Sequence, residues 1–487
     1  MEHAAHWRAG EGRLYSFGVK VRNALLAGLI LVVAGGVPSG LAPGGLRSAH
    51  AAPAHKPNII FVLTDDMRPD EMTMTANMRP NGGFDWIRDH GVQFSKYIST
   101  DNLCCPGRTT ALTGKTSYNH GVQTNENRHT DLQKDSLPIY LSNAGYCTAF
   151  TGKYHINNPR VRPAGWTYWE PTVGEGNGYA MLRRNGTVFH PDVYQTDYLA
   201  DVASHQLADC HAAGSPAALA FWPAAPHQGF EPAKKYAKTP IKLGKRDASF
   251  NEADISDKPV WLRKWFPKTK PASYWDPIRA TRVRTLLSVD DALKRLISEL
   301  HASGELTNTL FVLSADNGFL LGEHRVRSRK RLAYEAAQPG LWLAGPGFPV
   351  GVVSNAFATN LDLLPTMLKT AGGTIPWPKL DGRALQDVLR ARKHGHDRFL
   401  PIHVPIETAD AKYQPTGNGV RTWRYKYIKY ADGSQELYDL LHDPHELTNV
   451  VNDARYRSVA AAMRSLQPKA RACKADRCRV SAPSALQ

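Results

Sequence analysis

The sequence predicts a layered α/β domain built on a large, mostly parallel sheet between helices, followed by a small antiparallel subdomain near the C-terminus. Three observations lead to this prediction. Short apolar runs end abruptly in polar residues, segments with helical periodicity alternate with these runs, and paired strands replace this pattern after about residue 385. The chain has 487 residues, enough for one large domain and a smaller one.

Four apolar runs are expected to form strands that are buried on both faces of the sheet. Continuous apolar runs of this length are typical of parallel strands. Together with their polar endings they occupy residues 58–66, 147–155, 217–227 and 309–318. Ligands of such sheets bind beyond the carboxyl ends of the strands, so we expect the four polar endings to meet at one rim.

Helices are expected between these strands. Residues 288–303 have an apolar face and are followed by Gly304, a common helix stop. Residues 136–144 and 361–371 show a similar pattern, and each is also closed by a glycine. The face of the first helix consists of Val289, Ala292, Leu293, Leu296, Ile297 and Leu300.

The C-terminal part has a different character. Residues 420–430 and 435–441 predict an antiparallel hairpin with a turn at Asp432-Gly433. We therefore expect a main α/β domain over residues 52–385, an antiparallel subdomain over 386–455 and a basic tail over 456–487. The tail is expected to be solvated rather than to form a docking patch.

The first 51 residues are typical of a secretory signal peptide. Four basic residues precede the apolar run 24–37, and an A-x-A-like site follows at residues 49–51. The alternative is a membrane anchor, but a bilayer span needs about 20 apolar residues. We therefore expect export to the cell exterior or a periplasm-like compartment, and no stable membrane span in the mature chain.

The charge of the chain favours an anionic partner. The formal net charge is +16, and removal of residues 1–51 would leave +13. Such a charge favours an anionic substrate, polymer or surface, although a merely soluble basic protein is the alternative.

Six cysteines are too few for a disulfide scaffold, but some should pair in an oxidising compartment. The plausible pairs are Cys147 with Cys210 and Cys473 with Cys478. This leaves Cys104 and Cys105, which are adjacent and therefore in poor geometry for a bond to each other.

Two pairs of residues with side-chain oxygen atoms end predicted strands. Asp65 and Asp66 finish the first, and Asp316 and Asn317 finish the run 309–315. Each pair alone could be a turn or a helix cap. Two pairs at carboxyl ends favour a metal site, because hard cations such as calcium prefer oxygen ligands.

The stretch 101–115, DNLCCPGRTTALTGK, predicts a short helix that begins near Pro106 and ends at Gly114. Cys104 would lie just ahead of the helix N-terminus, where the helix dipole stabilises negative charge. Arg108 would add positive charge one turn further on. These features alone predict a low thiol pKa and a cysteine nucleophile.

The motif Cys104-x-Pro106-x-Arg108, followed by Leu112-Thr113-Gly114, resembles the signature of type I sulfatases. The resemblance implies an alkaline-phosphatase-like fold. It also implies that a dedicated maturase oxidises Cys104 to formylglycine, whose hydrated aldehyde is the nucleophile. Gly107 stands where the family usually has serine.

The resemblance extends over residues 57–450, and some of its context is faintly similar to the N-acetylglucosamine-6-sulfatase branch. It implies that a calcium ion is bound by Asp65, Asp66, Asp316, Asn317 and the modified residue 104. It also implies active-site roles for Arg108, Lys153, His155, His227 and Lys330. As single residues, the histidines could equally be ordinary hydrogen-bonded side chains, and Lys330 lies in a basic run that could be solvated surface or could line the entrance for a polyanion.

The resemblance implies an exported enzyme that hydrolyses sulfate esters of carbohydrates or aryl alcohols. A phosphonate or phosphate ester hydrolase of the same superfamily is one alternative, and a basic, non-catalytic glycan-binding protein is another. No nucleic-acid partner is expected.

Overall fold

The computed structural model describes residues 55–487 apart from 127–131, 133, 157–160, 174–177, 179–181, 185, 186, 190, 191, 330, 331, 407–411 and 413. The expected signal peptide and Lys330 therefore lie outside the described residues. Within the described part of the chain, no helix is both long enough and apolar enough to cross a membrane.

An eight-stranded sheet forms the centre of the main domain, in the order β12-β2-β11-β8-β1-β7-β3-β4. Only β11 runs antiparallel to its neighbours, so the predicted large, mostly parallel sheet is confirmed. The strands are β1 (Asn58–Thr64), β2 (Gly91–Ile98), β3 (Cys147–Gly152), β4 (Tyr168–Pro171), β7 (Ala217–Trp222), β8 (Thr309–Ala315), β11 (Leu341–Ala344) and β12 (Val352–Thr359). Two small pairs, β5–β6 (Leu182–Arg184, Thr187–Phe189) and β9–β10 (Leu320–Leu321, Arg327–Arg329), lie outside it.

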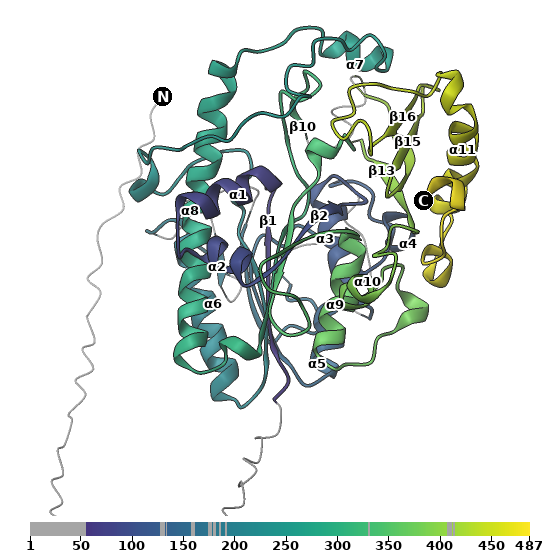
Figure 1. The fold of residues 1–487 in the computed structure, drawn as a ribbon. Coiled ribbons are helices and arrows are strands. Elements are labelled where there is room, and N and C mark those ends of the chain that lie inside the picture. Colours follow the sequence, from purple (N-terminus) through teal and green to yellow (C-terminus); the bar gives the residue numbers. More distant parts are fainter. Residues whose placement is uncertain are drawn as a thin grey trace, which may run out of the picture. The chain divides into compact units, whose positions relative to one another are not determined.

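Helices cover both faces of this sheet (Figure 1). Their apolar sides join two separate cores, which explains why the strands between them are apolar on both faces. One face carries α1 (Pro69–Met78), α2 (Gly83–Asp89), α6 (Gln195–Ala212) and α8 (Ala272–Ala302). The other carries α3 (Cys104–Thr113), α5 (Leu137–Asn143), α9 (Leu363–Thr370) and α10 (Leu385–Arg390).

Helix α8 is longer than the sequence pattern indicated. The predicted helix 288–303 is only its C-terminal half, and all six residues of the predicted apolar face are buried. The N-terminal half was missed because Pro277 and several arginines interrupt the apolar pattern there.

The C-terminal subdomain contains an antiparallel sheet in the order β13-β14-β15-β16. Its strands are β13 (Phe399–Val404), β14 (Gly417–Thr422), β15 (Tyr425–Tyr430) and β16 (Gln435–Asp439). The predicted turn at Asp432-Gly433 joins β15 to β16. Residues 420–430, expected as one strand, belong to two, because the chain reverses where the Tyr425 amide donates to the Thr422 hydroxyl at 3.0 Å.

The basic segment after residue 456 is folded and is therefore not a tail, although basic side chains such as Arg464, Lys469 and Arg471 are exposed as expected. It forms α11 (Arg457–Arg471), which packs Met463 and Leu466 into the core of the C-terminal sheet. Beyond α11 the chain returns to the main domain, where the Ala475 amide donates to Asp381 at 2.7 Å. The short helices α4 (Ser117–His120) and α7 (Val260–Trp265) are the remaining α-helices of the residues that the structure describes.

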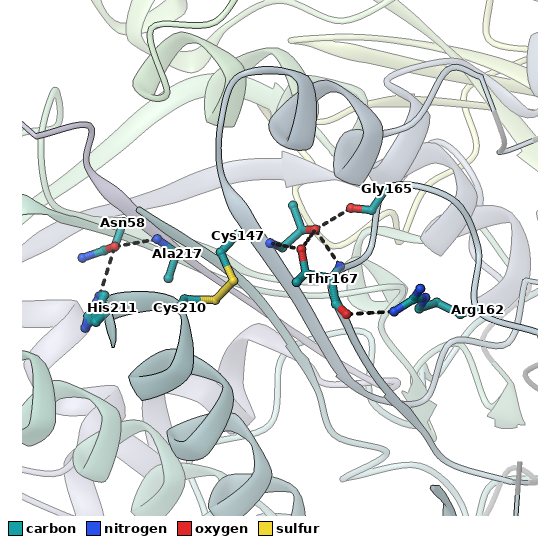
Figure 2. The surroundings of a disulfide bond; sticks show 9 residues. Asn58, Cys147, Arg162, Gly165, Thr167, Cys210, His211 and Ala217 are labelled. Carbon is teal, nitrogen blue, oxygen red and sulfur yellow. Dashed lines mark hydrogen bonds between the residues drawn. A yellow bond between two sulfur atoms is a disulfide. The ribbon is translucent and has the colours of Figure 1, made fainter. Parts of the chain in front are cut away.

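Both expected disulfides are present. Figure 2 shows Cys147, at the start of β3, bonded to Cys210 near the end of α6. Beside this bond, the side-chain oxygen of Asn58 accepts a hydrogen bond from the Ala217 amide at 2.8 Å. The disulfide therefore ties a covering helix to the sheet at the end opposite the polar rim.

Candidate active site

The predicted polar endings meet at one rim of the sheet because their strands are neighbours. The order β8-β1-β7-β3 brings together segments that are far apart in the sequence. Asp65 and Asp66 follow β1, Asp316 and Asn317 follow β8, Lys153 and His155 follow β3, and His227 lies beyond the end of β7.

Helix α3 delivers Cys104 to this rim. The helix begins at Cys104 itself, two residues before the predicted start, and ends at Gly114 in the left-handed conformation with φ 61°. Cys104 is only 1% exposed, and its thiol donates to the carboxylate Oδ1 of Asp65 at 3.4 Å. The residue therefore lies at the positive end of a helix and against a carboxylate.

Four side chains at the rim form a group suited to a cation. Ligand atoms of Asp65, Asp66, Cys104 and Asp316 all lie within 4.8 Å of one another. Asn317 lies against this group, because its amide nitrogen donates to Asp66 Oδ1 at 2.7 Å. Its amide oxygen is buried and accepts no hydrogen bond from the described residues. Three buried carboxylates and a spare amide oxygen fit a hard divalent cation.

Arg108 and Lys153 offset part of the negative charge. The Arg108 guanidinium contacts Asp316 at 2.9 Å and Asp65 at 3.2 Å, and it donates to the Lys153 carbonyl. The Lys153 ammonium forms an ion pair with Asp65. Burial alone would lower the pKa of Arg108, but the carboxylates of Asp316 and Asp65 outweigh it and raise that pKa. Arg108 therefore stays charged and fixes three strand ends relative to α3.

The two histidines occupy different positions at the rim. His227 Nε2 lies 4.0 Å from Asp66 Oδ2, and its other ring nitrogen lies 3.0 Å from the Gln228 carbonyl. His155 is buried, and its backbone is left-handed with φ 55°. Contacts at the rim thus connect Asp65, Asp66, Asp316, Asn317, Cys104, Arg108, Lys153 and His227, whereas His155 is placed near them only by its position three residues after β3.

Two residues that the sequence pattern did not single out also build the site. Trp222, the last residue of β7, lies under the Arg108 guanidinium with its ring centre 5.3 Å away. Arg282 reaches the rim from the middle of α8 and donates to the Asp66 carbonyl at 2.7 Å. Arg282 continues the buried stripe of α8 at helical spacing, and a charged residue in such a stripe is a signal that could have identified it.

Two family models match the chain. The sulfatase model matches residues 57–373, and the model of the C-terminal region of N-sulphoglucosamine sulphohydrolase matches residues 322–472. The first covers all the described site residues.

Curated relatives and solved structures agree with these matches. An arylsulfatase of Volvox carteri is 29% identical over 505 residues, which cover 89% of this chain and 77% of that protein. Human N-acetylglucosamine-6-sulfatase is 28% identical over 82% of each chain. A solved structure in complex with its substrate, D-glucosamine-2-N,6-O-disulfate, superposes with a TM-score of 0.72 at 23% identity, covering 87% of this chain and 98% of that one. The chain therefore belongs to the sulfatase family of sulfuric ester hydrolases.

Proposed function

We propose that this protein is an exported sulfatase that hydrolyses sulfate esters with a formylglycine made from Cys104 and with a bound calcium ion. The observation that carries the proposal is the position of Cys104, at the start of α3, with its sulfur within 4.8 Å of carboxylate oxygens from the segments that follow β1 and β8. In the hydrated form, formylglycine would supply one hydroxyl for attack on sulfur and a second for release of sulfate.

The donor set supports calcium as the metal. Asp65, Asp66, Asp316 and Asn317 offer oxygen atoms, which hard cations prefer, and residue 104 would complete the group. A bound calcium ion would act as a Lewis acid that stabilises negative charge on the sulfuryl oxygens.

The chain's own cations have distinct proposed tasks. Arg108 and Lys153 hold residue 104 and its neighbouring carboxylates in place. His227 and Lys153 would stabilise negative charge on the sulfuryl oxygens, where preorganised charge contributes most to the rate. His227 or Lys330 would protonate the departing alcohol oxygen. His155 would then take the proton of the second hydroxyl, so that sulfate is expelled and the aldehyde forms again. The role of Lys330 rests on the sequence resemblance alone.

A sulfated glycan is the proposed substrate class. The similarity to N-acetylglucosamine-6-sulfatase and the net charge of +13 without residues 1–51 both favour an anionic sugar. The expected signal peptide and a separate formylglycine-generating maturase complete the proposal.

The first test is mass spectrometry of the peptide that contains residue 104, from protein secreted by its native host. We expect a mass that matches formylglycine. An intact thiol would contradict the proposed nucleophile and would favour the non-catalytic, glycan-binding alternative.

A second test compares turnover of matched sulfate and phosphate esters, including N-acetylglucosamine-6-sulfate and 4-nitrophenyl sulfate. We expect the sulfate esters to be hydrolysed faster. Faster turnover of the phosphate or phosphonate esters would instead support a phospho-ester hydrolase that uses the same rim.

A further inference from the structure

Arg282 is completely buried and belongs to α8 rather than to a strand-end segment. A buried guanidinium is costly unless its charge and its donors are satisfied. Glu71 of α1 balances it, because its two carboxylate oxygens accept from Nε and from a terminal nitrogen, the latter at 2.9 Å. The ion pair thus fixes the guanidinium in one orientation.

The remaining donors of Arg282 are directed at the backbone of two site segments. One terminal nitrogen donates to the Asp66 carbonyl at 2.7 Å, and the other donates to the Pro226 carbonyl at 3.1 Å. Asp66 is a proposed calcium ligand, and Pro226 immediately precedes the proposed sulfate-binding His227. One side chain therefore holds the backbone of both segments.

The same guanidinium also lies over two aromatic rings, one of them from a third site segment. The guanidinium carbon lies 4.7 Å from the ring centre of Phe319 and 5.5 Å from that of Phe230. Phe319 follows the proposed ligand Asn317 by two residues, and Phe230 follows His227 by three. Arg282 thus contacts the chain beside β1, β7 and β8.

Asp66 needs such support because its backbone is left-handed, with φ 66°. This conformation is less favourable than the right-handed one for residues other than glycine, although aspartate adopts it more readily than most. The Asp66 amide donates to Asp316 Oδ1 at 3.1 Å, and Arg282 secures the carbonyl on the other side of the residue. Loss of the Arg282 contact would free the peptide that orients the Asp66 carboxylate.

We infer that Arg282 is a positioning residue that sets the calcium affinity of the site through the Asp66 backbone and orients the segment that carries His227. This inference rests on the proposed function, because it takes Asp66 as a metal ligand. Lysine cannot replace Arg282, since a single ammonium has no planar fork to serve Glu71 and two carbonyls together. Residues that support metal ligands from outside typically change metal affinity by about 10–100-fold when altered.

The test measures calcium binding directly, by isothermal titration of calcium into the calcium-depleted full chain. We expect Arg282→Lys to bind calcium about 10–100-fold more weakly than the wild type. The matched control is Arg398→Gln. Arg398 is also fully buried and forms a two-pronged ion pair with Asp362, at 2.7 and 3.1 Å, but it donates to no carbonyl of the site segments. We expect this control to lose stability and to keep its calcium affinity within about twofold.

Glu71→Gln is a second variant in case Arg282→Lys does not fold. It keeps Arg282 and weakens its anchoring, so we expect calcium binding to fall by a smaller factor than in Arg282→Lys. Wild-type affinity in folded Arg282→Lys, or in Glu71→Gln if the first variant is not folded, would overturn the role of Arg282 while leaving the calcium site in place. Absence of calcium binding by the wild type would overturn the proposed calcium site, and the inference with it.

Discussion

At the scale of single residues, the close approach of α3 to the end of β8 is made possible by Gly107. A Cβ atom added there would lie 2.4 Å from the Asp316 carbonyl oxygen, closer than any real contact of that kind. A serine, which the family usually has at this position, would carry such a Cβ atom. With glycine here, α3 lies directly against the backbone of Asp316, a proposed metal ligand.

We predict that Gly107→Ala destabilises the protein by about 1–3 kcal/mol, because the overpacked atom must push α3 away from Asp316. Without this contact, alanine in a helix would be favoured over glycine by roughly 0.5–1 kcal/mol. Urea-induced unfolding measures the change. Gly373→Ala, whose added Cβ would be no closer than 3.5 Å to its nearest neighbour, is the control. A stabilised Gly107→Ala protein would contradict the prediction.

His120 is a buried histidine that the fold keeps neutral. One ring nitrogen accepts from the Val122 amide at 3.1 Å, and the other lies 3.0 Å from the Thr110 hydroxyl. An accepting nitrogen carries no proton, so the ring is uncharged in this arrangement. Burial lowers the pKa of His120 to about 4, against the opposing effect of Asp101.

We predict that His120 makes the protein less stable in mild acid. The His120 ring takes up a proton near pH 6.5 in the unfolded chain but only near pH 4 in the folded chain. The contribution of His120 to the unfolding free energy is therefore fully present above pH 6.5 and is lost as the pH falls towards 4. The loss from this one group is on the order of 3 kcal/mol by pH 4. Unfolding free energies at pH 7 and pH 4 should differ less in His120→Gln than in the wild type. An equal pH dependence would refute the assignment.

At the scale of elements, α11 stabilises the C-terminal sheet through an apolar side that the basic composition of the segment obscured. Met463 is completely buried against the sheet, whereas Ser465 is exposed. We predict that Met463→Ala lowers the unfolding free energy by about 2–5 kcal/mol, because it leaves a cavity. Ser465→Ala should change it by less than about 0.5 kcal/mol. Equal effects in chemical denaturation would show that α11 does not dock as described.

The two disulfides should contribute unequally to stability. Cys147–Cys210 closes a loop of 63 residues and Cys473–Cys478 one of 5, so the chain-entropy model gives about 4 and about 2 kcal/mol. We predict a larger loss of thermal stability for the double variant Cys147→Ala/Cys210→Ala than for Cys473→Ala/Cys478→Ala. Calorimetry of both variants checks this order, and the reverse order would count against the entropic explanation.

Elements were predictable where a local pattern was complete. The strand ends at Asp65 and Asp316 follow uninterrupted apolar runs, and a parallel sheet must bring such ends to one edge. The N-terminal half of α8 was not predictable in this way, because Arg282 is buried through partners on α1 and on three strand-end segments. No local window of sequence contains those partners.

At the scale of the whole molecule, the C-terminal sheet braces the segment that follows Lys330. The Ala333 carbonyl accepts from Lys426 at 2.7 Å, and the Glu335 amide donates to Glu446 at 2.7 Å. The resemblance to sulfatases places the proposed catalytic Lys330 just before this segment. The basic composition of residues 325–331 gave no sign of the contacts that the following residues make with the distant C-terminal subdomain. These contacts link the small subdomain to residues 333 and 335, which lie outside the main sheet.

The proposed calcium ion should stabilise the whole molecule, because its carboxylate ligands come from strands about 250 residues apart in the sequence. We predict that removal of calcium with a chelator lowers the melting temperature and that added calcium restores it. Calcium at 100 times its dissociation constant would contribute about 2.7 kcal/mol. Magnesium, which requires a tighter octahedral shell, should restore less. A melting temperature that does not respond to calcium would contradict the metal site.

The burial of Cys104 also determines whether modification of this residue comes before or after folding. With 1% of its surface accessible, the residue is out of reach of another enzyme once α3 has docked against the ends of β1 and β8. Synthesis reaches Cys104 long before it reaches β8, so a newly made chain exposes this cysteine while the partners that will enclose it do not yet exist. An enzyme that modifies Cys104 must therefore act during this interval, which ends when the chain folds and encloses the cysteine.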